Sequence, residues 1–242
     1  MLLKKIYIIF LPIFIVTSVF PQNHSNNKSS LIIGDNYRIY PGSVTQTEVF
    51  IVKNPVDDNI LFSSGNTLTL SPFFISEGIY VTTNGGSSWQ GNDTCTGEPI
   101  AFHGGDPGIV IDKNGMFIIT RLGRPPFTGL YSHISTDNGQ TWSSQVALST
   151  DDLERATITT DAVPTSSFYG KTYAAWVKLT TPFSVALAFT DDGAQSWSTP
   201  QQINNPTNRS AGGDITTGPN GEIYLCWAGV TDVSPFREIF VG

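Results

Sequence analysis

The sequence predicts an all-β protein made of repeated small sheets, and two observations lead to this fold class. First, an eight-residue segment ending in tryptophan occurs three times in the 242-residue chain, at residues 82–89, 135–142 and 190–197. The closing residues Trp89, Trp142 and Trp197 are 53 and 55 residues apart, and a near-constant period of this length is typical of repeat architectures. Second, the chain has 23 glycines and 12% aromatic residues and no long run of helix-forming residues.

These three segments, here called the octets, have the composition of side-chain-locked turns. The Asp or Asn at the third position is expected to accept hydrogen bonds from backbone N–H groups two or three residues further on. Central glycines supply the positive φ that hairpin turns need, and the tryptophan is expected to fold back and bury its ring. Each octet follows an alternating apolar run, so it caps one strand and leads into the next. The residues with this structural role are Thr82, Asn84, Gly86 and Trp89, then Ser135, Asp137, Gly139 and Trp142, then Thr190, Asp192 and Trp197.

The octets resemble the Asp-box, or BNR repeat, of the sialidase-like β-propeller family, with the pattern Ser/Thr-x-Asp-x-Gly-x-Thr/Ser-Trp. The second octet fits fully, whereas the first carries Asn84 in place of Asp and the third carries Ala194 in place of Gly. The resemblance implies a β-propeller of the sialidase type whose blades are four-stranded sheets. About 3.5 blades are present, against roughly six in that family, so we expect an incomplete ring from the N-terminal portion of a longer protein. A closed ring of four blades is the alternative.

The chain begins with the pattern of a secretory signal peptide, predicted at residues 1–22. Lys4 and Lys5 precede an apolar run that ends at Phe20, too short to span a bilayer as a helix; an uncleaved N-terminal anchor is the alternative. Residues 23–33 are predicted to be a flexible leader. Cleavage would remove two lysines and change the formal net charge from −7 to about −9. Such an acidic surface argues against binding nucleic acid or, after cleavage, a membrane. We therefore expect a secreted or cell-surface protein.

Residues 34–242 are predicted to form the propeller blades. Blade 1 is expected at about 46–102, blade 2 at about 105–150, blade 3 at about 154–205 and a partial blade 4 at about 211–242. The predicted innermost strands are 48–53, 106–112, 155–161 and 212–218, and in blade 1 the next two strands are expected at 59–64 and 78–82. Second strands such as 117–119 and 173–177 are apolar without alternation, as expected for strands covered on both faces.

The sequence contains no motif for a cofactor or metal ion, and none is predicted. His24, His103 and His133 have no zinc-ligand spacing to another His or Cys, and residues 112–115 resemble a turn more than a calcium loop. Cys226 lies in an apolar strand-like run and is expected to be buried, whereas Cys95 lies in a loop-like stretch. Export would permit a disulfide between them, and the sequence leaves both states open.

Candidate ligand-binding residues come from the innermost strands, which line the central channel of a propeller. Glu48, Asp106, Arg155 and Asp214 lie at the starts of these strands, one in each successive blade. Convergent polar groups at a concave mouth form the default binding-site hypothesis; the alternative is that they are solvated strand ends. The family resemblance also implies an arginine near the start of the domain that grips a sialic acid carboxylate. Arg38, in Tyr-Arg-Ile-Tyr-Pro, is the candidate, although its motif carries one inserted residue.

The resemblance implies an exported protein that binds or hydrolyses glycans or surface polysaccharides, with exo-α-sialidase activity as its specific form. The alternative is a non-catalytic binding or adhesion propeller of a larger secreted or surface protein. Two stretches, residues 46–48 and 161–173, resemble those of exported Asp-box proteins without established sialidase activity. The nucleophilic Tyr and the remaining arginines of a sialidase come from later blades, so the sequence leaves open whether the chain is an enzyme.

Overall fold

The computed structural model describes residues 34–204, 209–230 and 237–241. The chain divides into two units, Met1–Tyr37 and Arg38–Gly242, and the second contains every strand described below. The predicted signal peptide and leader, residues 1–33, lie outside the described residues. In the described part of the chain no helix is long and apolar enough to cross a membrane, and the helical structure there is one 3-10 turn, Ile100–Phe102.

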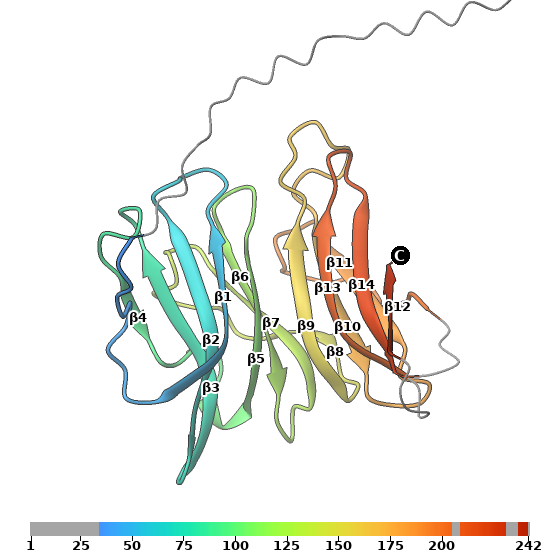
Figure 1. Cartoon of the computed structure of the whole chain (residues 1–242), viewed down its shortest axis with the longest axis horizontal. Coiled ribbons are helices and arrows are strands. Elements are labelled where there is room, and N and C mark those ends of the chain that lie inside the picture. The colour runs from blue at the N-terminus through green and yellow to red at the C-terminus, as the bar shows by residue number, and fades with distance from the viewer. Residues whose placement is uncertain (1–33, 205–208, 231–236, 242) are drawn as a thin grey trace, which may run out of the picture. The chain divides into compact units, whose positions relative to one another are not determined.

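The strands form four antiparallel sheets, each running from its first strand to its last in sequence order (Figure 1). Blade 1 contains β1 (Thr45–Lys53), β2 (Leu61–Leu70), β3 (Phe73–Thr82) and β4 (Gln90–Asn92). Blade 2 contains β5 (His103–Ile111), β6 (Phe117–Gly123), β7 (Gly129–Ser135) and β8 (Val146–Ser149). Blade 3 contains β9 (Leu153–Thr160), β10 (Thr172–Lys178), β11 (Val185–Thr190) and β12 (Gln201–Gln202). Blade 4 has three described strands, β13 (Arg209–Thr217), β14 (Ile223–Val230) and β15 (Arg237–Val241).

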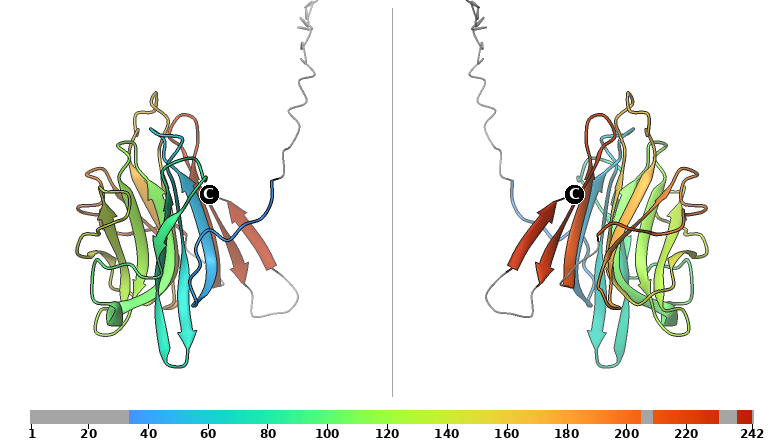
Figure 2. Two further views of the ribbon diagram at one scale, coloured as in Figure 1. Left: turned by 90° about the vertical axis from the view of Figure 1, so that its left-hand side faces the viewer. Right: turned by 90° about the vertical axis from the view of Figure 1, so that its right-hand side faces the viewer.

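The first strands of the four sheets lie next to one another in the order β1, β5, β9, β13, and the sheets stand side by side as blades in Figure 1, a row that Figure 2 shows from its two ends. The described strands make an open arc rather than a closed ring. The predicted fold class, an all-β propeller of the sialidase type with an incomplete ring, is therefore confirmed. The strand bounds differ most from the prediction in blade 1. There β2 and β3 pair as far as Leu70 and Phe73, whereas the predicted strands ended at residue 64 and began at residue 78.

The three octets form the same turn. In the second, the Ser135 hydroxyl accepts a hydrogen bond from the Gly139 backbone N–H (2.9 Å) and donates one to Asp137 Oδ1 (2.7 Å). The Asp137 carboxylate also accepts from the Thr141 N–H at 2.9 Å and from its hydroxyl at 2.6 Å. These bonds lower the pKa of Asp137 to about 2. The Asp137 carboxylate therefore accepts a hydrogen bond from the backbone of the fourth residue after it, and not only from the second or third as predicted. Residues 84–88 and 192–196 repeat the bond to the fourth residue, at 2.9 and 3.0 Å.

Positive φ occurs at the fourth and fifth positions of every octet. These are Gly85 and Gly86, Asn138 and Gly139, and Gly193 and Ala194. Ala194 adopts φ 61° although an L side chain disfavours it, and its methyl group is buried against Val110 and Ile118 of blade 2. Burial of that methyl group offsets part of the backbone strain. The third octet therefore packs on blade 2, and Gly139 of the second octet lies against Ile79 and Val81 of blade 1.

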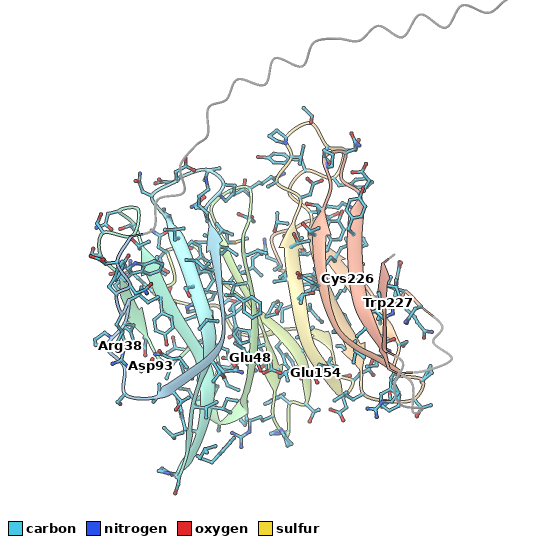
Figure 3. All side chains as sticks on the ribbon, in the orientation of Figure 1. Arg38, Glu48, Asp93, Glu154, Cys226 and Trp227 are labelled. Carbon is cyan, nitrogen blue, oxygen red and sulfur yellow. The ribbon has the colours of Figure 1, made fainter. Side chains whose placement is uncertain are left out.

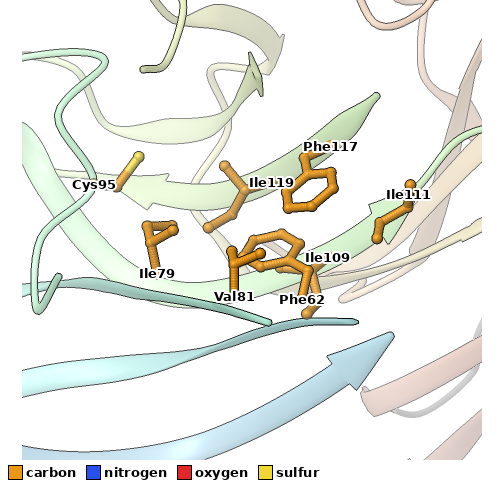
Figure 4. Packing of buried hydrophobic residues seen from close by; sticks show 8 residues of the cluster. All are labelled: Phe62, Ile79, Val81, Cys95, Ile109, Ile111, Phe117 and Ile119. Atoms are coloured by element: carbon orange, nitrogen blue, oxygen red, sulfur yellow. The ribbon is translucent and has the colours of Figure 1, made fainter. Parts of the chain in front are cut away.

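The hydrophobic core is a series of layers, one between each two neighbouring blades. Figure 4 shows the layer between blades 1 and 2, where the rings of Phe62 and Phe117 stack with centroids 4.8 Å apart. An alanine-rich layer around Trp176 lies between blades 2 and 3, and Ile215 and Leu225 of blade 4 pack on blade 3. Cys95 is buried in the first layer, where burial raises the pKa of its thiol to about 12. Both Cys95 and Cys226 are free thiols, and Cys226 is half-buried rather than buried as predicted.

Candidate functional site

Each innermost strand carries a β-bulge at the same position. The register of β1 with β2 shifts between Thr47 and Phe50, that of β5 with β6 between Gly105 and Gly108, and that of β13 with β14 between Ala211 and Asp214. In blade 3 the shift lies opposite Trp176, so that two residues of β9, Arg155 and Ala156, face this one residue of β10. Bulges re-aim side chains and are over-represented beside functional sites. The four bulges therefore mark one level of the central channel.

The bulges place Glu48 and Asp106 in equivalent positions. Each is the first bulged residue of its strand, with φ 53° and φ 54° respectively. Arg155 is the corresponding backbone position of blade 3, and Gly212 (φ 56°) is that of blade 4. Asp214 follows the Gly212–Gly213 bulge directly, opposite Cys226, and its carboxylate accepts a hydrogen bond from the Ile215 N–H at 2.9 Å. Three of the four predicted residues, Glu48, Asp106 and Arg155, thus occupy equivalent backbone positions. In blade 4 that position belongs to Gly212 and not to Asp214.

Blade 1 holds the Asp106 bulge in place. Asn66 of β2 accepts a hydrogen bond from the Asp106 backbone N–H (2.6 Å) and donates one to its carboxylate (3.1 Å). Gly105, the residue before, donates its N–H to Glu77 at 2.9 Å. A Cβ at Gly105 would lie 2.6 Å from Asn66 Oδ1, so this close approach and the positive φ of 84° both require glycine. The Asp106 side chain is therefore fixed and half-buried, whereas Glu48 is exposed.

A hollow of about 580 Å³ lies at this level of the channel. We call it the axial hollow. Glu48 of blade 1, Glu154 of blade 3 and Arg209 of blade 4 line it, together with the Gly212–Gly213 bulge. Figure 3 shows Glu48 and Glu154 close to the middle of the arc of blades. The guanidinium of Arg209 stacks over the Phe183 ring at 4.2 Å, a contact that restrains a long cationic side chain. Two carboxylates and one cation thus face the same space from three blades.

Arg38 does not lie in the axial hollow. Its guanidinium donates a hydrogen bond to the Gly42 carbonyl at 2.7 Å, and Figure 3 places Arg38 and Asp93 at the outer edge of blade 1, away from Glu48.

Sequence reasoning missed Glu154 and Arg209, because each stands one or more residues before the strand start that we predicted. The detectable signal was the pair Gly212–Gly213, which suits a bulge.

A second cluster of polar side chains is buried in the junction between blades 1 and 2. Glu77 pairs with His103 at 2.5 Å, and Arg121 donates from Nε to His133 Nε2 at 2.9 Å and from Nη2 to Gln145 at 2.8 Å. Four of these side chains, those of Glu77, His103, Arg121 and His133, are fully buried. His133 Nδ1 donates to the Ser143 carbonyl at 2.8 Å, so the ring is neutral with its proton on Nδ1. We call this set the junction network.

Burial shifts the pKa values of two members of the junction network, His133 and Arg121. It lowers the pKa of His133 from its usual 6.5 to about 4, with the positive charge of Arg121 acting in the same direction. Burial also lowers the pKa of Arg121, opposed by the nearby Glu77 carboxylate. Every member has a protein partner and none opens into the axial hollow, so the network stabilises the blade junction. Among the described residues, no group of three His, Cys, Asp or Glu side chains is arranged to hold a metal ion.

The solved structures that resemble this chain are propellers at low sequence identity. The Hadza microbial sialidase Hz136 is 17% identical, with a TM-score of 0.56, over 81% of this chain and 44% of its own. A leech intramolecular trans-sialidase complexed with 2,7-anhydro-Neu5Ac is 10% identical, with a TM-score of 0.60, over 82% and 50%. The GH93 α-L-arabinofuranosidase of Fusarium graminearum, complexed with arabinobiose, is 14% identical, with a TM-score of 0.58, over 81% and 61%.

The chain therefore spans between 44 and 61% of the length of these three structures. No protein-family model matches the sequence, and no curated protein matches it. At these identities the likeness establishes the fold, a β-propeller of the sialidase type, and function has to be argued from the site.

Proposed function

We propose that this chain belongs to an exported propeller protein that binds glycans in the axial hollow. The observation that carries the proposal is the convergence of Glu48, Glu154 and Arg209, from three different blades, on one hollow of about 580 Å³. This volume lies within the usual range of ligand pockets, and a few convergent polar groups are what orients a bound ligand. Carboxylates and a guanidinium are strong partners for sugar hydroxyls. The propellers named above that are bound to sugars lend support by analogy.

Glycoside hydrolysis is a second candidate because two carboxylates line the same hollow. Most glycosidases use one carboxyl group as general acid and another as base or nucleophile, and Glu48 and Glu154 are the residues available for those roles. The exo-α-sialidase form needs a cation for the substrate carboxylate. Arg209 is the described side chain that could fill this role, since Arg38 lies at the outer edge of blade 1. A non-catalytic binding or adhesion propeller uses the same residues without turnover.

The test uses the full-length protein and separates binding from turnover. A glycan array is probed with the wild type, with Glu154→Gln and with Arg209→Ala, and fluorogenic sialosides, arabinofuranosides and galactosides are assayed in parallel. Asp191→Asn, an exposed acid of the third octet, is the matched control. Retention that is lost in both hollow variants but not in the control supports the site. Turnover lost in Glu154→Gln selects hydrolysis, and a blank array with no turnover removes the proposal.

Export is part of the proposal and has its own test. The basic and apolar pattern of residues 1–22 supports it. We expect the protein in the medium or at the cell surface, with an N-terminus near residue 23 when the purified protein is sequenced. Retention of Met1–Gln22 in the mature protein would instead support a membrane-anchored form.

A further inference from the structure

A second hollow lies on the outside of the molecule, between blades 1 and 2. It has a volume of about 260 Å³, and its walls are β4 of blade 1 and the second octet, which belongs to blade 2. We call it the junction groove. Its floor is apolar, made by Ile79, Val81 and the half-buried Trp142. Both walls belong to blades that the structure describes, so further blades at either end of the arc would leave the groove open.

The polar lining of the junction groove consists of amides and hydroxyls. Gln90 and Asn92 project from the β4 side, and Asn138 and Gln140 from the octet side. None of the lining residues has an ionisable side chain, although the chain as a whole has a formal net charge of −7. Asn92 Oδ1 accepts hydrogen bonds from Thr94. The side-chain amides of Gln90, Asn138 and Gln140 have no hydrogen-bond partner within the described residues, so they are available to a ligand.

Two residue differences distinguish the junction groove from the equivalent place between blades 2 and 3. In blade 3 the Trp197 Nε1 donates to Ser132 of the preceding blade at 2.9 Å. Ile79 occupies the position of Ser132 in blade 1, three residues before the octet. Isoleucine cannot accept a hydrogen bond, and Trp142 Nε1 instead donates to the Gly139 carbonyl of its own turn at 3.1 Å. The third octet also has the buried Ala194 methyl where the second has Gly139, so the junction between blades 1 and 2 keeps space that the junction between blades 2 and 3 fills.

This lining matches the chemistry of an uncharged sugar. Side-chain amides both donate and accept, as vicinal sugar hydroxyls do, while an indole and aliphatic floor suits the C–H face of a pyranose ring. A charged ligand would lose its hydration here without gaining an ion partner. The volume lies just under the range of drug-sized ligand pockets and suits a single sugar residue. We propose that the junction groove binds one neutral sugar residue of a glycan, independently of the axial hollow.

The experiment measures binding of neutral oligosaccharides to the full-length protein. The probes are methyl glycosides and trisaccharides of glucose, galactose, mannose and N-acetylglucosamine, with sialyllactose as the charged comparison. Kd values are measured by NMR titration, following the indole N–H resonances, at sugar concentrations up to about 10 mM, because a single sugar residue binds weakly. We expect at least one neutral probe to bind and to shift the Trp142 indole resonance, with sialyllactose binding no more tightly.

The variants assign the site. The double variant Gln90→Ala/Gln140→Ala removes two groove side-chain amides from exposed positions and is expected to weaken neutral-sugar binding about tenfold, since the hydrogen bonds of both amides to the sugar are lost. Gln195→Ala, at the position of Gln140 in the third octet, is the matched control and should bind as the wild type does. Glu154→Gln in the axial hollow should leave the sugar-induced shift of the Trp142 indole resonance unchanged, whatever it does to binding in the axial hollow.

Three results would overturn the inference. In the first, no neutral probe binds. In the second, the double variant binds the sugar as the wild type does. In the third, binding is lost in Glu154→Gln but kept in the double variant. The last result would assign the sugar to the axial hollow and so support the proposed function while excluding the groove. Conversely, binding that depends on the groove amides and not on Glu154 would support the groove even if the axial hollow proved inert.

Discussion

The junction between blades 1 and 2 has the same backbone arrangement as the junction between blades 2 and 3. At equivalent positions, however, the first contains polar side chains and the other apolar ones. In blade 1, Asn66 and Glu77 face each other across β2 and β3. The corresponding pair in blade 2 is Leu122 and Leu130. Leu153 at the start of β9 likewise replaces His103 at the start of β5, and it is buried in the apolar layer between blades 2 and 3.

Two residues further along the third strand the pattern reverses. Blade 1 has apolar Ile79 where blade 2 has polar Ser132, and this exchange decides whether the next tryptophan bonds across the junction or within its own turn. The same scaffold thus tolerates a charged or a hydrocarbon interior, provided that each buried polar group finds a partner. The distribution of polar positions, and not the fold, determines where a groove remains.

The largest expected effect comes from removing the acid of the junction network. Glu77→Leu, which copies Leu130, should lower the free energy of unfolding by about 3–5 kcal/mol, because it leaves His103, the Gly105 N–H and the charge of Arg121 without their partner. Urea unfolding of the full chain measures it. The control is Leu130→Met, expected to cost less than about 1.5 kcal/mol.

A combined variant sharpens this comparison. Asn66→Leu/Glu77→Leu/His103→Leu rebuilds the apolar pattern of the second junction and should recover part of the loss, although Arg121 remains buried. If Glu77→Leu alone proved neutral, the buried Glu77–His103 hydrogen bond would contribute nothing to the junction and the comparison would fail.

The second effect is a pH dependence confined to the charged junction. His133 has a folded pKa of about 4, below its usual 6.5, so between these values the unfolded chain binds the proton that the native protein excludes. The contribution of His133 to the free energy of unfolding is therefore fully present above about pH 6.5. It is lost as the pH drops toward 4, by at most about 3 kcal/mol. Urea midpoints at several pH values between 7 and 4 measure the slope.

The variant that isolates this effect is His133→Gln, whose amide can still meet Arg121 and the Ser143 carbonyl. It should unfold at lower urea than the wild type at neutral pH, yet with a flatter dependence on pH down to about 4.5. An unchanged slope would mean that another group takes up the proton.

These two junctions also show which parts of the molecule the sequence could reveal. The octets predicted the propeller because turn, strand and tryptophan recur locally within eight residues. The β2–β3 hairpin was predicted too short, since Gly65, Asn66 and Glu77 have low β-propensity and only their tertiary partners keep them in a strand. Glu48, Asp106 and Arg155 were found in register because the inner strands repeat. The axial hollow was only partly predictable, since the meeting of Glu154 and Arg209 depends on how three blades are placed around the axis.

A smaller effect distinguishes the two tryptophans. Ser132→Ala removes the acceptor of Trp197 Nε1 and should lower stability by about 1 kcal/mol, the usual cost of an unmade hydrogen bond at a partly buried site. In the NMR spectrum the Trp197 indole N–H resonance should move while that of Trp142, which bonds within its own turn, stays. Movement of both resonances would show that the two junctions are coupled.

The smallest effect concerns the octet acid itself. In the first octet Asn84 makes the same backbone bond as Asp137, accepting from the Ser88 N–H at 2.9 Å, while its amide donates to the Ser88 hydroxyl at 2.8 Å. A hydroxyl can accept as readily as it donates, so Asp137→Asn should reverse the bond to Thr141 without opening the turn. We expect a loss of less than about 1 kcal/mol at pH 7, as for most exposed substitutions. The acid dependence of unfolding between about pH 4 and 2 should weaken, because the depressed pKa of Asp137 stabilises the folded state only above that range. A large loss at pH 7 would mean that the carboxylate charge, and not the hydrogen-bond pattern, holds these turns closed.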